Sequence, residues 1–201
     1  MDPLRADPMK LHPQEQAQVA DAVDKRRREY AAGRLLAHSL LHELGADSCV
    51  PLINGADRAP QWPAGVVGSI THCMGWCAVA AASAAVSRGI GIDIEPAQPL
   101  PEGTATLVLT AAEHDGLARL PPALRAHAER LVFSAKEAAY KALYPSTRTF
   151  LDFPDLQVEL DTDGGFVATP TRAAAIATGP IRGRYRVTGE YLATAVVLPP
   201  V

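Results

Sequence analysis

The segment over residues 89–95 constrains the fold of this chain more than any other, because it has the pattern of a β-strand with two chemically different faces. Three isoleucines alternate with glycine and acidic residues, and successive side chains of a strand point to opposite faces. The isoleucines therefore share one face, and Asp93 and Glu95 share the other. The simplest interpretation is a half-buried strand whose acidic face is solvated.

The two acidic side chains also suggest a metal site. Side chains two positions apart on a strand lie roughly 7 Å apart. Two carboxylates that close repel each other unless a cation lies between them. Mg²⁺ suits this arrangement, because it prefers oxygen ligands and leaves positions for water and a substrate phosphate.

A second informative stretch covers residues 133–145 and has helical spacing. On a helix, Glu137 and Lys141 lie on one face with about 6 Å between their Cβ atoms, and Lys136 and Tyr140 form the neighbouring row. Several alanines in between would let this helix approach a sheet closely. The structural interpretation is an exposed Glu–Lys pair worth a few tenths of a kcal/mol.

Composition limits the class of protein. The 201 residues, 48% of them hydrophobic, suit one compact domain or two small halves that share a core. The net charge of −3 argues against a general polyanion binder, so any basic function must be local. Three cysteines are an odd number and favour a reducing compartment. Without a signal-like apolar segment, a soluble cytoplasmic protein is expected.

Helices and short strands are predicted to alternate. In the first part of the chain, a helix over residues 24–44 carries an apolar stripe and stops at Gly45. Three strands are expected to form an antiparallel meander packed on this helix, over residues 66–72, 76–82 and 89–95.

The second part of the chain repeats this plan after a proline-rich connection over residues 96–101. Thr110 and Glu113 form a capping box that opens a short helix. A longer helical segment begins at Pro121 and is expected to stop at Pro145. Four strands follow, over residues 156–160, 165–169, 185–188 and 192–198.

Three motifs, taken together and in this order, resemble the 4′-phosphopantetheinyl transferases. They are Gly68-Ser-Ile-Thr-His72, Gly91-Ile-Asp-Ile-Glu95 and Phe133-Ser-Ala-Lys-Glu-Ala-Ala-Tyr-Lys141. The chain is most similar to the single-chain subclass that includes the siderophore-synthesis and surfactin-type enzymes. Ala138 departs from the family, which often has serine there, but the charged positions on either side are kept.

The resemblance implies an α+β fold made of two similar halves with antiparallel sheets. Such a pseudo-dimer binds coenzyme A in the cleft between its halves. The corresponding division of this chain is residues 1–100, with His72, Asp93 and Glu95, and residues 101–201, with the helix motif.

The resemblance also implies the roles of the charged residues. Mg²⁺, with Mn²⁺ as an alternative, would be held by Asp93, Glu95 and Glu137. Lys141 would contact the phosphate that is transferred, and Lys136 would help to hold the pyrophosphate. Glu137 or a metal-bound water would take the proton of the attacking serine.

Coenzyme A would be held from the first half of the chain. His72 would donate a hydrogen bond to a phosphate, with Thr71 beside it, although a lone histidine is more often structural. The arginines implied at the 3′-phosphoadenosine end are Arg26, Arg34 and Arg58. Arg27 or Arg28 could take the place of Arg26, because helical register decides which side chain faces the cleft.

The implied reaction moves the phosphopantetheine arm to a serine of an apo acyl or peptidyl carrier protein and releases adenosine 3′,5′-bisphosphate. A carrier with an acidic helix would dock through the connection after Pro96 and residues 144–150, which include Arg148. A monomer with no nucleic-acid or membrane partner is expected.

Three other interpretations compete. Another Mg²⁺-dependent phosphoryl or nucleotidyl transferase would share the carboxylates but not use coenzyme A, and the lack of a Walker-type loop argues against ATP or GTP. A nucleic-acid-binding module could use the basic run over residues 25–28. That run is short, the net charge is negative and aromatic residues are only 5%. A zinc site at His72, Cys73 and Cys77 lacks a second Cys/His pair.

Overall fold

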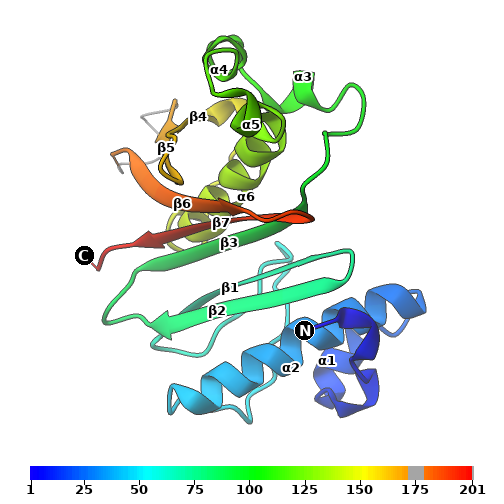
Figure 1. Ribbon diagram of the computed structural model, residues 1–201. Helices are drawn as coiled ribbons and strands as arrows, with labels where there is room; N and C mark the ends of the chain where they lie inside the picture. The colour runs from blue at the N-terminus through cyan, green and yellow to red at the C-terminus, as the bar shows by residue number, and fades with distance from the viewer. Residues whose placement is uncertain (172–178, 201) are drawn as a thin grey trace.

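Residues 1–171 and 179–200 form two antiparallel sheets, and the larger one joins residues far apart in sequence. In the computed structural model, which describes residues 1–171 and 179–200, strand β3 (Gly89–Pro96) pairs along its whole length with the last strand, β7 (Tyr191–Leu198). The five-stranded sheet has the order β3-β7-β6-β5-β4 (Figure 1). Its other strands are β4 (Leu156–Leu160), β5 (Gly165–Pro170) and β6 (Ile181–Val187).

The smaller sheet is a hairpin of β1 (Val66–Cys73) and β2 (Trp76–Ser83), with Gly75 at a φ of 78° in its turn. Side chains, not a backbone ladder, join β1 to β3. The hydroxyl oxygens of Ser69 and Thr71 accept hydrogen bonds from the amides of Ile92 (3.1 Å) and Ile94 (3.2 Å). The predicted meander of three consecutive strands is therefore wrong, because the backbone of β3 pairs with β7.

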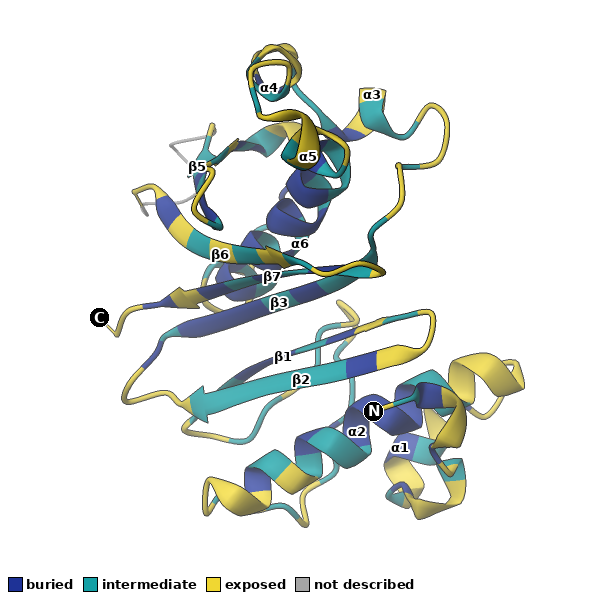
Figure 2. Cartoon of the chain, in the orientation of Figure 1, coloured by how far each residue is buried: buried dark blue, intermediate teal, exposed yellow. Residues whose placement is uncertain are grey.

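Helix α6 (Ala128–Thr147) lies directly on β3 because the residues at their contact have small side chains or none. A Cβ atom added to Gly91 would lie 1.8 Å from the carbonyl oxygen of Ala138, and one added to Gly89 would lie 2.2 Å from that of Ala142. Both alanines are fully buried, and much of α6 and β3 has the colour of buried residues in Figure 2. The glycines of the strand and the alanines of the helix therefore bring the two motifs into contact, as the small residues predicted.

Helix α2 (Asp24–Glu43) covers the hairpin, as predicted for the first helix (Figure 1). The chain enters α2 through η1 (Pro3–Arg5), η2 (Pro8–Lys10) and α1 (Pro13–Ala17). Between β3 and α6 lie α3 (Ala105–Val108), α4 (Ala111–Leu117) and α5 (Pro122–Arg125), and η3 (Phe153–Asp155) precedes β4.

The predicted end of the long helix is wrong. Pro145 lies inside α6, which continues to Thr147 and ends with Arg148 in a left-handed conformation. Pro145 has no N–H to donate to the carbonyl four residues earlier, so the helix loses one hydrogen bond there and ends two residues later. The predicted capping box is confirmed, since the Thr110 amide donates to Glu113 Oε2 at 2.7 Å and the Glu113 amide donates to Thr110 Oγ1 at 3.2 Å.

The α+β class with antiparallel sheets is confirmed, and each sheet has its own apolar core. One core lies between α6 and the five-stranded sheet, and the other lies around the N-terminal segment, α2 and Cys77. The division at residue 100 stays a prediction, and β3, before that boundary, pairs with β7 after it. Within residues 1–171 and 179–200, no helix is long and apolar enough to cross a membrane.

Candidate functional site

Asp93 is the point where β1, β3 and α6 meet. Its side chain is buried, and Lys141 Nζ lies 2.6 Å from its Oδ1. The Thr71 hydroxyl donates to the same oxygen at 3.1 Å, and the Ser134 hydroxyl donates to Oδ2 at 2.9 Å. The structure therefore brings together three residues predicted from separate motifs and adds Ser134, which had no predicted role.

Glu137 faces the same cluster from α6. Burial raises the pKa of its carboxyl, the charges of Asp93 and Glu95 raise it further, and Lys141 opposes them. Among the described residues, no side chain or amide donates a hydrogen bond to this carboxylate. Glu137 is thus a partly buried acid whose pKa is raised by two neighbouring carboxylates and lowered by Lys141.

Glu95 is held by an arginine that sequence reasoning missed. Arg130, in the first turn of α6, lies 2.7 Å from Glu95 Oε2 and also donates to the carbonyls of Gln98 (3.1 Å) and Pro99 (2.6 Å). Burial raises the pKa of Glu95, and Arg130 opposes this. The available signal was spacing, because residues 130, 134, 137 and 141 recur on one face of a helix.

The three carboxylates fit a divalent cation in chemistry, since Mg²⁺ prefers oxygen ligands. In the part of the chain that the structure describes, no three His, Cys, Asp or Glu residues are gathered closely enough to hold a metal. Asp93 is paired with Lys141 and Glu95 with Arg130. Glu137 accepts no hydrogen bond from the described residues, so it is the carboxylate that most needs a cation.

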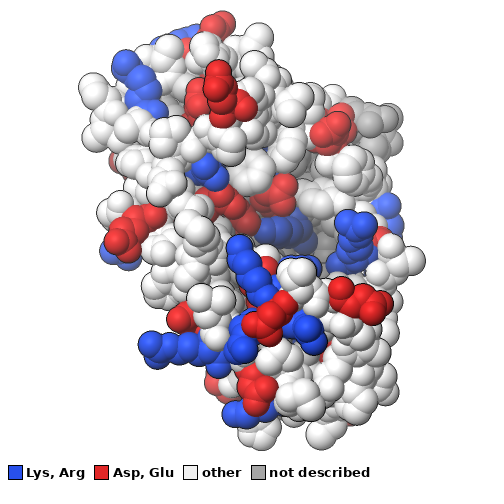
Figure 3. Space-filling model, turned by 90° about the vertical axis from the view of Figure 1, so that its right-hand side faces the viewer, with Lys and Arg blue, Asp and Glu red and all other residues white. Residues whose placement is uncertain are grey.

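A cavity of about 270 Å³ opens next to this cluster, between the segment 57–70 and α6. Lys141 lines the cavity and also contacts Asp93, so the two features are continuous. Arg58 lines it from the other side, and Trp62 packs on Gly68, where an added Cβ would lie 2.4 Å from the indole. Figure 3 shows acidic and basic side chains meeting around a hollow at mid-height on the face that it presents.

His72 lies beside the cluster and is paired with Arg26. Arg26 NH1 lies 2.9 Å from His72 Nε2, and the Glu29 carboxylate lies 3.9 Å from His72 Nδ1. Burial lowers the pKa of His72, and Glu29 opposes this. Arg28 is instead paired with Asp24 at 2.7 Å, so Arg26, not Arg28, faces His72. Glu29 was not predicted.

Two residues predicted to contact the ligand are instead bonded within the protein. Lys136 is 1% exposed, and its ammonium donates to Glu113 (2.8 Å), the Val108 carbonyl (2.7 Å) and the Phe153 carbonyl (2.9 Å). All three of its donors are used, so it cannot reach a pyrophosphate.

Arg34 is likewise committed to the protein interior. It is 5% exposed, donates to the Leu52 carbonyl at 2.9 Å and to Asn54 Oδ1, and lies 4.0 Å over the Tyr30 ring. The residue that was expected to bind the nucleotide instead anchors the segment that leads into the cavity wall.

Comparisons with known proteins place both halves of the chain. The family model described as "4′-phosphopantetheinyl transferase N-terminal domain" matches residues 14–82, and that described as "4′-phosphopantetheinyl transferase superfamily" matches residues 89–195. Together they include every residue of the acidic cluster and of the cavity.

Curated relatives match over most of the chain. The 4′-phosphopantetheinyl transferase Svp of Streptomyces mobaraensis is 42% identical over 89% of this chain and 71% of its own length. The 4′-phosphopantetheinyl transferase PptT of Mycobacterium tuberculosis is 36% identical over 97% of this chain and 90% of its own length. Enterobactin synthase component D of Escherichia coli O157:H7 is 43% identical over 75% of this chain and 64% of its own length.

Proposed function

Because this chain belongs to the 4′-phosphopantetheinyl transferase superfamily, we propose that it moves the phosphopantetheine arm of coenzyme A to a serine of a carrier protein and releases adenosine 3′,5′-bisphosphate. One observation supports this most strongly. Lys141 lines the cavity with Arg58 and contacts the buried Asp93 carboxylate, so a phosphate in the cavity would lie near groups suited to its transfer.

Binding would begin with the anionic groups of coenzyme A. Arg58 and Lys141 line opposite walls of the cavity, and both are cations at neutral pH. Arg26 and His72 lie beside the cluster and are available to a further phosphate oxygen. Lys141 and His72 would hold the pyrophosphate, and Arg58 and Arg26 would hold the 3′-phosphoadenosine end.

A divalent cation would be held by Asp93, Glu95 and Glu137. Such an ion neutralises charge on phosphate oxygens and acts as a Lewis acid. Ser134 and Thr71 hold the Asp93 carboxylate in place by donating to its two oxygens. Arg130 does the same for Glu95.

The chemical step would form a bond from the serine oxygen to the β-phosphorus and break the bond to the departing bisphosphate. The serine proton must go to a base, and Glu137 is the proposed acceptor, directly or through water. Burial raises its pKa, so it accepts a proton more readily than an ordinary carboxylate. Lys141 would offset negative charge on the phosphate throughout.

The proposed partner is an apo acyl or peptidyl carrier protein, and the enzyme is proposed to act as a cytoplasmic monomer. The docking surface predicted after Pro96 and over residues 144–150 remains a prediction. Phe150 in that surface is 71% exposed, as an apolar contact site requires.

Intact-mass spectrometry tests the proposal. The protein is incubated with Mg²⁺, coenzyme A and a panel of apo carriers, and one or more carriers should gain about 340 Da, the mass of the added group. The matched control is Glu137→Gln, which should leave the carriers unmodified. If no carrier gains this mass with the wild-type protein, the proposed reaction is wrong.

A further inference from the structure

The loop that carries Arg58 into the cavity wall has an unusual backbone. Arg58 has a φ of 64°, in the left-handed region that non-glycine residues rarely adopt. A tight turn surrounds it, with the Arg58 amide donating to the Gly55 carbonyl at 2.9 Å and the Gly55 amide donating to the Ala59 carbonyl at 2.9 Å. Such strain persists where surrounding contacts determine it, and it often marks functional positions.

Asp57 supplies those contacts with both carboxylate oxygens. Oδ1 accepts a hydrogen bond from the Ala59 amide at 3.1 Å, which closes the turn around Arg58. Oδ2 accepts from the Tyr144 hydroxyl at 3.0 Å and from Arg148 at 2.9 Å, both at the end of α6. One side chain therefore links the conformation of Arg58 to the opposite wall of the cavity.

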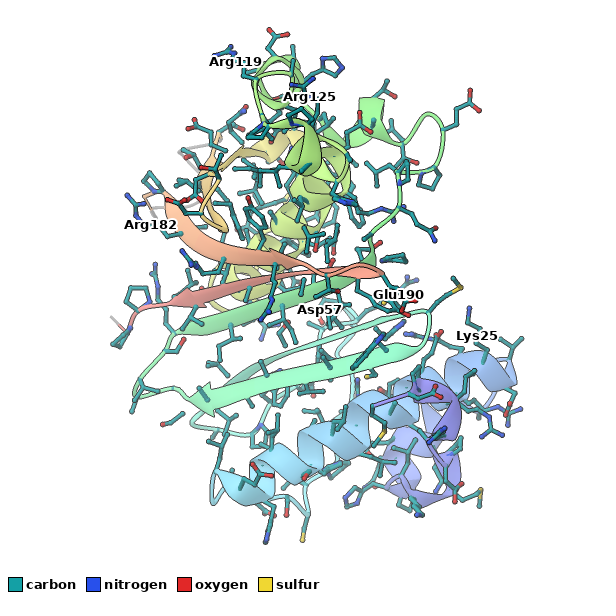
Figure 4. The ribbon with its side chains drawn as sticks, viewed as in Figure 1. Lys25, Asp57, Arg119, Arg125, Arg182 and Glu190 are labelled. Atoms are coloured by element: carbon teal, nitrogen blue, oxygen red, sulfur yellow. The ribbon has the colours of Figure 1, made fainter. Side chains whose placement is uncertain are left out.

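The position of Asp57 makes this link relevant to a ligand. Asp57 and Arg58 line the cavity on one side, and Tyr144 and Lys141 line it on the other. Figure 4 shows Asp57 at the level where the hairpin meets the five-stranded sheet. The Ala59 amide and then the Tyr144 hydroxyl lower the pKa of the Asp57 carboxyl, so it stays ionised at neutral pH.

We infer that Asp57 is a positioning residue for coenzyme A, which fixes the backbone of Arg58 so that its guanidinium is presented to the phosphate of the nucleotide end. The same carboxylate clamps the loop against α6 and so keeps the two walls of the cavity together. This inference rests on the proposed function, because it takes coenzyme A as the occupant of the cavity. Asp57 itself, an anion, does not contact the phosphate.

Three substitutions separate the two roles of Asp57. Asp57→Ala removes both the turn and the clamp. Asp57→Asn keeps a side-chain oxygen for the turn, which asparagine favours, but removes the charge that holds Arg148. Arg148→Gln removes the ion pair alone. Arg119→Ala, an exposed arginine on the far side of the chain from the cavity, is the matched control (Figure 4).

Isothermal titration of the protein, in buffer containing Mg²⁺, with coenzyme A and with 3′-dephospho-coenzyme A tests the inference. Asp57→Ala should weaken coenzyme A binding about tenfold. Asp57→Asn and Arg148→Gln should each weaken it about threefold. Binding of the dephospho compound should change little, so the preference for coenzyme A should fall. In turnover assays of Asp57→Ala, the KM for coenzyme A should rise while kcat stays the same.

The outcomes distinguish this inference from the proposed function. If the wild-type protein binds no coenzyme A, the proposed function fails and the inference with it. If the wild type binds coenzyme A but Asp57→Ala binds it equally well, or loses affinity equally for both compounds, then Asp57 has no role in positioning Arg58 and only the inference is overturned. Thermal unfolding of each variant confirms that it is folded.

Discussion

Replacing Lys136 with methionine should destabilise the fold and leave the cavity lined by Arg58 and Lys141 intact. Lys136 lies in the second motif next to Glu137, and its sequence position predicted a contact with pyrophosphate. In the structure its ammonium is enclosed by Glu113 and two backbone carbonyls. Burial lowers the pKa of Lys136, and the Glu113 carboxylate opposes this. The substitution removes the cation and leaves the Glu113 carboxylate buried.

The size of the effect follows from what remains around Glu113. Removing one partner of a buried ion pair costs about 3–5 kcal/mol, because the other charge is left uncompensated. The amides of Thr110 and Val158 still donate to Glu113 at 2.7 Å each, which favours the lower end of that range. For a chain of this length, about 3 kcal/mol corresponds to a fall in Tm of roughly 6–12 °C.

Urea denaturation followed by circular dichroism measures the loss of unfolding free energy, and calorimetry measures the Kd of coenzyme A. Lys136→Met should lower the first and change the second by less than about twofold. Adding Glu113→Gln should recover part of the stability, since no buried charge is then left alone. Lys25→Met, at a lysine whose side chain is 67% exposed, is the control and should change the free energy by less than about 0.5 kcal/mol. An unchanged unfolding free energy with a large rise in the Kd would refute the structural role and restore the pyrophosphate contact.

Three further predictions follow from the site. Glu137→Gln should abolish transfer yet stabilise the metal-free protein at pH 7. The pKa of Glu137 is raised in the folded state, so the wild-type protein loses stability as the pH rises through that pKa and the carboxyl ionises. In urea denaturation the variant should therefore be more stable than wild type at pH 7 and equally stable in acid, and an equal stability at pH 7 would contradict this. Gly91→Ala should lower the unfolding free energy by about 3 kcal/mol or more, because its Cβ would lie 1.8 Å from a backbone oxygen of α6. Gly116→Ala is the control, since a Cβ there meets open space and should not destabilise the protein. Equal urea midpoints of the two variants would contradict this. Arg130→Met should lower the unfolding free energy by about 1–3 kcal/mol, because it removes the donor to Glu95. Mg²⁺ should restore part of that loss in the same denaturation assay. If Mg²⁺ restores none of it, Glu95 is not a metal ligand.

Much of the site could be predicted because its charged residues follow the side-chain periods of one strand and one helix. Alternation along the strand places Asp93 and Glu95 on one face, and the structure confirms that this face, with Gly91, meets α6. Helical spacing likewise places Glu137 and Lys141 together, and both lie at the cluster around Asp93. These relations depend only on the geometry of one strand and one helix, which backbone dihedral angles determine.

Residues outside such patterns could not be predicted in this way. Arg130 and Ser134 lie on the same face of α6 as Glu137, but a polar side chain on a helix is equally consistent with a solvated face. Asp57 reaches α6 across a long sequence separation, and nothing near it in the sequence identifies Tyr144 or Arg148 as its partners.

The amino-acid sequence alone therefore determined the elements, the family resemblance and the acidic residues of the site. Only the tertiary structure decided that β3 pairs with β7 and that Lys136 is buried against Glu113 while its neighbour Glu137 lies where the charge of Asp93 affects it. The physical reason is range. Strand and helix periods are set by bonds between neighbouring residues, whereas strand pairing and the burial of a charge depend on which distant segments can satisfy the same polar groups once water is excluded.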